Sequence, residues 1–244
     1  MRATHLQRKA IRIDGTAVRA LIFDFDGVLA DTEALHCAAF QATAASIGLT
    51  MARAEYFRCF LGLPDRECLD ALCVRAGRQL TAAALDDLCA RKRQEFARLL
   101  PAAQLYAGVA DTLRRLHAHF VLAIASGAYR DEIEPILMRA QVRQLFAAVV
   151  GAEDVRAGKP APDPFLRALE EIGGRAGTLT AAECVVIEDS PNGLAAARSA
   201  GMRCIGVTTH HEGAALAADA VIEHVNQLRV EDLQRLGPST RASA

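Results

Sequence analysis

Two aspartates stand where an apolar segment near the start of the chain ends. In the stretch LIFDFDGVLADTE, Asp24 and Asp26 are separated by a single residue. Alternate side chains of an extended segment lie on one face, so both carboxylates can point the same way while Phe23 and Phe25 pack away from them. Gly27 then lets the chain turn sharply out of a strand. The pair is either the solvated end of an ordinary strand or part of a chemical site.

Three later stretches also place polar residues where an apolar segment ends. Ser126 ends VLAIAS, and Gly127 after it is expected to open a helix whose free N–H groups suit phosphate oxygens. Lys159 lies in the rigid stretch AGKPAPDPF, while Glu188 and Asp189 end CVVIED. Each feature also has a plain explanation, namely a serine that caps a helix, a solvated loop lysine, or acids at a strand tip.

The four stretches together favour one kind of chemistry if they meet at one edge of a sheet. Carboxylates that converge repel each other and bind protons unless a cation is present. A few carboxylate oxygens open to water suit Mg²⁺. A lysine would offset the remaining negative charge, and a hydroxyl with backbone N–H groups would hold an anion. We therefore predict a phosphoryl-transfer site with Mg²⁺ as cofactor. A calcium loop is disfavoured, because Gly27 is its fourth residue instead of its sixth.

Six apolar segments predict the strands that position these residues. Short apolar segments that alternate with helices indicate a parallel sheet covered on both faces, so the fold class is α/β. Ligands of such sheets bind beyond the carboxyl ends of the strands, which is where the acids fall. The segments are RALIFDF (19–25), FVLAIAS (120–126), FAAVVGA (146–152), CVVIED (184–189), RCIGV (203–207) and DAVI (219–222).

The first two strands are separated by far more chain than one crossover helix needs. This segment has helical patterns almost throughout, so we expect residues 33–104 to form an inserted α-helical cap domain. The α/β core domain is then built from 19–32 and 105–237. Residues 1–18 and 238–244 have no periodic apolar pattern and are expected to be tails.

Two polar residues of the expected cap lie on faces that otherwise look buried. Lys92 falls within the apolar stripe of the helix predicted over 81–100, and His36 shares a face with Phe40 on the first cap helix. Gly48 is the expected end of that first helix. Either Lys92 extends its charge to water and His36 is a hydrogen-bonded core histidine, or the two residues serve the site.

Composition excludes several classes of protein. The 28 basic and 29 acidic residues leave a net charge of −1, which gives no broad attraction to nucleic acids or to anionic membranes. No window approaches the roughly 18 apolar residues of a membrane span. The 7 cysteines form no C-x-x-C pair, so reduced thiols in a cytoplasmic protein are expected. We expect a monomer with neither nucleic-acid nor membrane partners.

The sequence resembles the haloacid dehalogenase superfamily. Its four signature segments occur here in order, as DFDGV, the segment around Ser126, GKPAPDPF and EDSPNG, and the resemblance covers about 19–228. It implies a Rossmann-like parallel sheet with an inserted helical cap. The helical insert directly after the first strand is similar to the branch that holds β-phosphoglucomutase and related phosphatases.

The resemblance implies roles for the acids. Asp24 would be the nucleophile that forms an aspartyl phosphate, and Asp26 the general acid and base. Asp24, the backbone carbonyl of Asp26, and Asp189 would bind Mg²⁺, with Glu188 as a further ligand or an orienting residue. Dehalogenases of this type usually lack an acid two residues after the nucleophile, so the presence of Asp26 disfavours that activity.

The resemblance also implies which residues hold the substrate. Ser126 and Lys159 would bind the phosphoryl oxygens, with the N–H of Gly127 beside them. His36 and Lys92 match cap positions that lie near the transferring group or a second phosphate in sugar-phosphate mutases.

We predict a Mg²⁺-dependent phosphatase that acts on a small phosphorylated metabolite, a sugar phosphate, with a β-phosphoglucomutase as the alternative. The LGLPDRE segment (61–67) resembles the cap substrate loop of the mutases. Against the mutase, Ala128, Tyr129 and Arg130 follow the second signature, where those enzymes typically carry a lysine. A phospho-accepting receiver domain is disfavoured by the order of the acids and by the helical insert.

Overall fold

The fold is given by a computed structural model, which describes residues 11–13, 16–61, 63–176, 178–209, 216–231 and 233. The chain divides into two compact units. The core unit is built from residues 1–30 and 105–244, and the cap unit is Asp31–Gln104. None of the helices in the described ranges combines the length and the hydrophobicity that crossing a bilayer requires.

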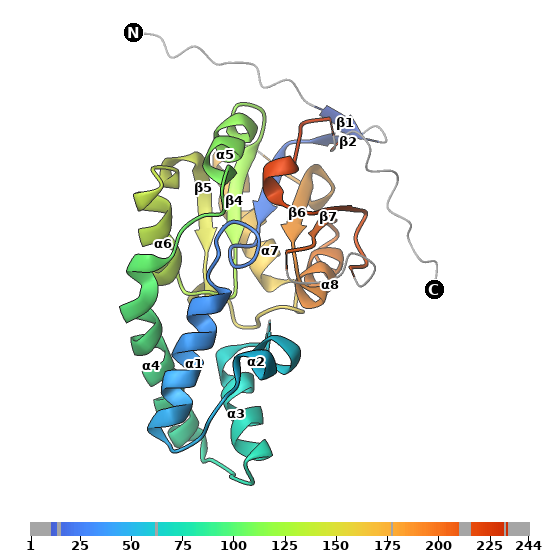
Figure 1. Cartoon of the computed structure of the whole chain (residues 1–244). Coiled ribbons are helices and arrows are strands. Elements are labelled where there is room, and N and C mark those ends of the chain that lie inside the picture. The colour runs from blue at the N-terminus through green and yellow to red at the C-terminus, as the bar shows by residue number, and fades with distance from the viewer. Residues whose placement is uncertain are drawn as a thin grey trace. The chain divides into compact units, whose positions relative to one another are not determined.

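The core unit contains a six-stranded sheet in which every neighbouring pair of strands is parallel. The strand order is β5-β4-β3-β6-β7-β8, and Figure 1 labels β5, β4, β6 and β7 of this sheet. The six strands expected from the sequence are present and confirm the α/β class. Their bounds are β3 (Ala20–Phe23), β4 (Val121–Ala125), β5 (Phe146–Val150), β6 (Cys184–Glu188), β7 (Arg203–Val207) and β8 (Ala220–Ile222).

Helices follow the strands along the chain and cover the sheet. Apolar residues of α7 and α8 pack with alternate residues of β3, β4, β5 and β6 in one buried cluster, so these two helices cover the same face (Figure 1). The central strands are buried over most of their length, which explains why they read as continuous apolar runs. The helices are α5 (Val109–His117), α6 (Arg130–Arg139), α7 (Asp163–Ala176) and α8 (Pro191–Ser199).

The N-terminal segment is not only a tail. Strands β1 (Ile11–Ile13) and β2 (Thr16–Val18) pair in an antiparallel two-stranded sheet. The expectation of a tail over 1–18 is therefore wrong for these residues, since three-residue strands are too short to produce a periodic pattern. The rest of that segment and the expected tail at 238–244 lie outside the described residues.

The cap unit is helical throughout its regular structure. Its apolar core joins side chains of all four α-helices, among them Phe40, Tyr56, Leu69 and Leu85. The first helix ends close to where the sequence predicts, since its last residue is Ser46 and Gly48, just after the C-cap Ile47, adopts a left-handed φ of 72°. The elements are α1 (Glu33–Ser46), α2 (Arg53–Cys59), α3 (Asp65–Arg75), α4 (Ala82–Leu99) and the short 3-10 helix η1 (Leu100–Ala102).

Candidate active site

The chain changes direction across the sheet between β3 and β6. From β3 it adds β4 and β5 on one side, then returns to place β6 directly against β3 on the other. Ligands of open parallel sheets bind at such a switch point, beyond the carboxyl ends of the strands. Asp24 follows the last residue of β3, while Glu188 ends β6 and Asp189 follows it. The backbone N–H of Asp24 donates to the carbonyl of Ile187 at 2.9 Å, which holds the two strand ends together.

Lys159 connects the two strand ends through its side chain. Its Nζ donates to Asp24 Oδ1 at 2.7 Å and to Glu188 Oε1 at 2.7 Å. The lysine side chain is 11% exposed, and Glu188 is completely buried. Charge-assisted hydrogen bonds in so dry a place are short and strong, because water does not compete for the donor. The plain explanation of Lys159 as a solvated loop lysine is therefore wrong.

Glu188 is held from a second side by the start of α8. Its Oε2 accepts hydrogen bonds from the N–H and the hydroxyl of Ser190, at 2.6 and 2.9 Å. Ser190 also caps α8, because its hydroxyl oxygen accepts the N–H of Gly193 at 3.0 Å. A Cβ built at Gly193 would lie 1.8 Å from Glu188 Oε1, so only glycine lets the helix approach the carboxylate so closely.

Three of the acids form a group that could hold a metal ion. One carboxylate oxygen each of Asp24, Glu188 and Asp189 lies within 4.8 Å of the others, and all three residues are buried. Hard oxygen donors in this number suit Mg²⁺, which normally keeps several waters. The acids present therefore fit the ion implied by the resemblance. Both oxygens of Glu188 already accept hydrogen bonds, from Lys159 and from Ser190.

Burial and the neighbouring acids raise the pKa of Asp24, so its charged form is disfavoured in the absence of a bound cation. Burial is the main cause that raises the pKa of Asp24 well above 3.8, and the charges of Glu188, Asp189 and Asp26 raise it further, while Lys159 opposes the change. Burial lowers the pKa of Lys159, but its ion pairs with Asp24 and Glu188 outweigh this effect and raise it overall. The site therefore holds a charged lysine among acids that compete for too little positive charge.

Asp26 lies in the turn that follows β3. Gly27 has a φ of 75°, and Asp26 pairs with Ala30 in an isolated parallel bridge, so the chain leaves the sheet sharply as expected. Asp26 is half-buried and does not belong to the group of three acids. The carboxylate of Asp26 is therefore not one of the three that could hold a metal ion together.

The loop after β4 offers few unused donors. The N–H of Ser126 donates to Val150 O, and the N–H of Ala128 donates to the Ser126 hydroxyl oxygen at 3.2 Å. The N–H of Tyr129 donates to Glu132, and that of Arg130 to Glu153. Among the described residues, the N–H of Gly127 has no such partner and remains available for an anion. The following helix, α6, begins at Arg130, so the expectation that Gly127 opens it is wrong by three residues.

In the cap unit, His36 and Lys92 are in direct contact. Lys92 Nζ lies 2.9 Å from His36 Nδ1 and 2.8 Å from Asp65 Oδ1, and the lysine side chain is 1% exposed. The ammonium also lies over the rings of Phe40 and Phe96, at 4.9 and 5.1 Å from their centroids. His36 stacks on Phe96, with centroids 4.0 Å apart. The charge of Lys92 does not reach water, so the alternative of a solvated lysine is wrong.

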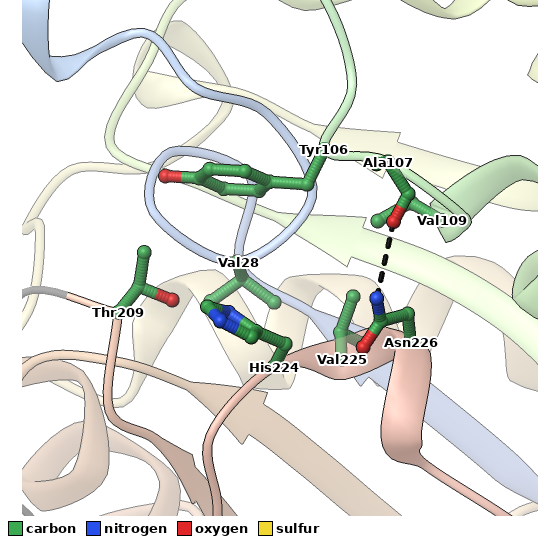
Figure 2. Close-up of a pocket in the computed structure, with 8 residues that line it drawn as sticks. All are labelled: Val28, Tyr106, Ala107, Val109, Thr209, His224, Val225 and Asn226. Atoms are coloured by element: carbon green, nitrogen blue, oxygen red, sulfur yellow. Dashed lines mark hydrogen bonds between the residues drawn. The ribbon is translucent and has the colours of Figure 1, made fainter.

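The one pocket described in the core unit does not contain the acidic group. Figure 2 shows this pocket of about 170 Å³, whose lining includes Val28, Tyr106, Thr209 and His224. The side-chain amide of Asn226 closes one side by donating to the carbonyl of Ala107 at 3.2 Å. Pockets for small ligands usually exceed roughly 300 Å³. The candidate active site is instead the acidic edge of the sheet, where Lys159 bonds to two of the grouped acids.

Four residues to which the sequence assigned no role contact the predicted site residues or shape their loops. They are Ser190, Gly193, Asp65 and Asp154. A serine before a proline at a helix start is a recognisable cap signal, so Ser190 was detectable in principle. Asp65 and Asp154 carry no such local signal, because their partners, Lys92 and Arg130, lie far from them in the sequence.

A family model and individual relatives match most of the chain. The model for haloacid dehalogenase-like hydrolases matches residues 21–207. The chain is 30% identical over 226 residues to validoxylamine A 7′-phosphate phosphatase of Streptomyces hygroscopicus subsp. limoneus, covering 91% of this chain and 99% of that protein. It is 30% identical over 220 residues to β-phosphoglucomutase of Bacillus subtilis (strain 168), covering 88% and 93%.

A solved structure of a protein from the same family is also similar to this chain. The chain superposes with a TM-score of 0.73 on a mutant of CbbY from Rhodobacter sphaeroides in complex with xylulose-(1,5)-bisphosphate. The two sequences are 28% identical, and the match covers 86% of this chain and 96% of that one. Fold, sequence segments and relatives agree. The chain belongs to the haloacid dehalogenase-like hydrolase family, in the branch that contains phosphatases and β-phosphoglucomutase.

Proposed function

We propose that this protein is a Mg²⁺-dependent phosphatase that hydrolyses a small phosphorylated metabolite, a sugar phosphate, through an aspartyl phosphate on Asp24. The observation that carries the proposal is the acidic group of Asp24, Glu188 and Asp189 with Lys159 bonded to two of its members. Bound Mg²⁺ would neutralise charge on the acids and on the transferring phosphoryl group.

The reaction divides between two aspartates. A carboxylate oxygen of Asp24 attacks phosphorus while the bond from phosphorus to the ester oxygen breaks, and Asp26 gives a proton to that leaving oxygen. Asp26 then takes a proton from water, whose oxygen attacks the aspartyl phosphate and releases inorganic phosphate with Asp24 restored. Covalent catalysis of this kind replaces one difficult displacement by two easier ones.

The remaining residues of the core would hold the phosphoryl group. The Ser126 hydroxyl accepts the N–H of Ala128, so its own proton is free to donate to a phosphoryl oxygen, next to the N–H of Gly127. Lys159 would balance the charge that develops on the same oxygens. The cap residues His36 and Lys92 would contribute to substrate binding. Validoxylamine A 7′-phosphate, named for one relative, is a substrate of the expected kind.

A mutase is the second candidate, because the chain is 30% identical to a β-phosphoglucomutase. The two activities differ in what accepts the phosphoryl group from Asp24, which is water in the phosphatase and a second sugar phosphate in the mutase. Isomerisation of β-glucose 1-phosphate without net release of phosphate would favour the mutase.

We further propose that the protein acts in the cytoplasm as a monomer, on small molecules and not on nucleic acids or membranes. All seven cysteines are free thiols, which suits a reducing compartment. Size-exclusion chromatography with light scattering tests the monomer, and a dimer mass would contradict it.

The test is a panel of phosphorylated sugars and other metabolites assayed for phosphate release with Mg²⁺ and with a chelator. We expect turnover with at least one sugar phosphate, its loss on chelation and its return with Mg²⁺. Asp24→Asn should abolish turnover without changing the fold, while Asp111→Asn, an exposed acid on α5, serves as control. Turnover that survives in the Asp24→Asn variant would contradict the proposed nucleophile.

A further inference from the structure

The loop after β4, residues 126–129, carries the two groups proposed to bind the phosphoryl oxygens, Ser126 and Gly127. It lies at the same edge of the core sheet as Asp24, because β4 pairs in parallel with β3 and the Cα of Ile124 lies opposite that of Phe23. A loop that binds a transferring group must keep its backbone in place, since a displacement of about 1 Å can cost about 100-fold in rate.

The segment after β5, residues 151–154, is bonded to the backbone of this part of the chain at two points. The N–H of Ala152 donates to the carbonyl of Ala128 at 3.0 Å. In the opposite direction, the N–H of Arg130 donates to the Glu153 carboxylate, at 3.1 Å from Oε1 and 3.3 Å from Oε2. The segment after β5 therefore both donates to the loop after β4 and accepts from the residue that follows it.

Asp154 adds a third connection, which involves a side chain. Its Oδ2 accepts the N–H of Gly151 at 2.8 Å and the guanidinium of Arg130 at 2.5 Å. Hydrogen bonds to an ionised carboxylate are stronger than those between neutral groups. One carboxylate thus holds the turn after β5 and the first residue of α6 together.

Gly151 lets the two segments approach each other closely. A Cβ built at this position would lie 2.9 Å from the backbone nitrogen of Arg130 and 3.2 Å from the carbonyl oxygen of Ala128. The φ of Gly151 is −102°, which any residue can adopt, so the backbone conformation does not require glycine. The close contact with the neighbouring backbone is the reason for a glycine here.

We propose that Glu153 and Asp154 are positioning residues of the active site, which hold the loop after β4 so that Ser126 and Gly127 keep the geometry that binds a phosphoryl group. This inference rests on the proposed function and adds the segment after β5 to the parts that the reaction needs. Neither carboxylate touches the substrate in this proposal, because both already accept hydrogen bonds from the protein.

The charge of the same carboxylates has an effect of the opposite sign. Negative charges close to an anion site repel the anion, so their removal should tighten phosphate binding if charge alone mattered. Loss of positioning should weaken phosphate binding instead. The direction of the change therefore distinguishes the two effects.

The test measures the affinity for inorganic phosphate with Mg²⁺ present, by calorimetry on the full-length protein, and kcat/KM for the best sugar phosphate of the panel. Glu153→Ala and Asp154→Ala should each weaken phosphate binding about threefold to tenfold, as expected for the loss of one or two hydrogen bonds, and lower kcat/KM similarly. Glu153→Gln keeps an oxygen acceptor without the charge, so its affinity should stay within about twofold of the unmodified protein. Unchanged or tighter phosphate binding in both alanine variants would overturn the inference.

Amide hydrogen exchange gives a readout that does not depend on activity. The N–H of Arg130 should exchange faster in Glu153→Ala, which removes its acceptor, and at the original rate in Glu153→Gln. Glu153 is exposed, so neither substitution leaves a buried group without a partner and both variants should fold. Equal exchange of this N–H in all three proteins would contradict the role of Glu153.

Gly151→Ala tests the contact from the backbone side. The new methyl group would force the two segments apart, so phosphate affinity should fall at least about tenfold. Gly174→Ala is the matched control, because nothing lies within 4 Å of its added methyl group. Glu170→Ala is the control for the acids, because that carboxylate is 71% exposed on α7. Both controls should bind phosphate as the unmodified protein does, and a normal affinity in Gly151→Ala would contradict the close packing.

The outcomes separate this inference from the proposed function. If the unmodified protein binds phosphate but hydrolyses no ester, and the alanine variants bind phosphate more weakly, the phosphatase fails and the positioning role stands. If esters are hydrolysed and the variants match the unmodified protein in kcat/KM and phosphate affinity, the phosphatase stands and the positioning role fails. A protein that neither binds phosphate nor releases it from any ester would overturn both proposals.

Discussion

At the scale of residues, Lys159 contacts two acids, Asp24 and Glu188, for which we propose different roles. Its ammonium contacts Asp24 and Glu188 at the same distance of 2.7 Å, yet the two acids have different surroundings. Glu188 is completely buried and accepts two more hydrogen bonds from Ser190, so it is a positioning group. Asp24, the proposed nucleophile, receives only one of its hydrogen bonds from Lys159, at Oδ1. The different roles proposed for the two acids therefore depend on their neighbours and not on residue type.

Asp26→Ala should slow both formation and hydrolysis of the aspartyl phosphate. In the proposed mechanism Asp26 donates a proton to the leaving oxygen in the first step and accepts one from the attacking water in the second, and general acid–base catalysis typically contributes about 10²- to 10⁴-fold. Rapid-quench measurements of phosphorylated protein with a good substrate follow both steps. A substrate with a leaving group of low pKa should partly rescue the first step. An unchanged rate for each step would show that another group transfers the proton.

At the scale of elements, α8 approaches Glu188 closely only because Gly193, in its first turn, has no side chain. Gly193 lies against the Glu188 carboxylate, and Ser190 caps the helix while it holds the same group. The helix is short, and its position therefore depends on packing against β6 and β7 instead of on its own stability.

Gly193→Ala should reduce kcat at least about tenfold, because the new methyl group would occupy the place of the Glu188 carboxylate and strain of this kind costs about 1–3 kcal/mol. Glu188 would have to move and lose Lys159 or Ser190. Gly174→Ala on α7 is a matched control, since nothing lies within 4 Å of its added methyl group. The control should be neutral or stabilising by about 0.5–1 kcal/mol. Steady-state kinetics and thermal unfolding distinguish the two, and normal kcat in Gly193→Ala would disprove the packing argument.

At the scale of the whole molecule, metal binding and stability are coupled through pH. The pKa of Asp24 is raised in the metal-free folded protein, chiefly by burial and then by the neighbouring acids. A raised carboxyl pKa favours the folded state while the group is protonated, and this contribution is lost as the pH rises through that pKa. A bound cation removes the penalty, because it needs the carboxylate form.

Mg²⁺ should therefore bind more tightly, and raise the thermal unfolding temperature more, at pH 8 than at pH 5.5. The physical reason is that protons compete with the ion for Asp24 at the lower pH. Calorimetry and thermal unfolding with and without Mg²⁺ measure both effects. In the Asp24→Asn protein the pH dependence should shrink, since asparagine does not titrate. A Mg²⁺ effect that is independent of pH would contradict the raised pKa of Asp24.

The amino-acid sequence alone determined the strands and the residues at their carboxyl ends. Continuous apolar segments must be buried, and parallel strands all end at one edge, so acids after Phe23 and after Ile187 had to approach each other once β3 and β6 paired. These two strands are far apart in the sequence, but few strand orders would bury all of the apolar segments, which limits how the sheet can be arranged.

Only the tertiary structure determined which side chains form ion pairs and hydrogen bonds with each other. The contacts of Lys92 with Asp65 and of Arg130 with Asp154 join residues that are 27 and 24 positions apart. Such contacts depend on how helices and loops pack, and local periodicity contains no information about that packing. The close approach of Gly193 to Glu188 was equally unpredictable from the sequence. The need for a glycine at this helix position becomes clear only from the carboxylate that packs against it.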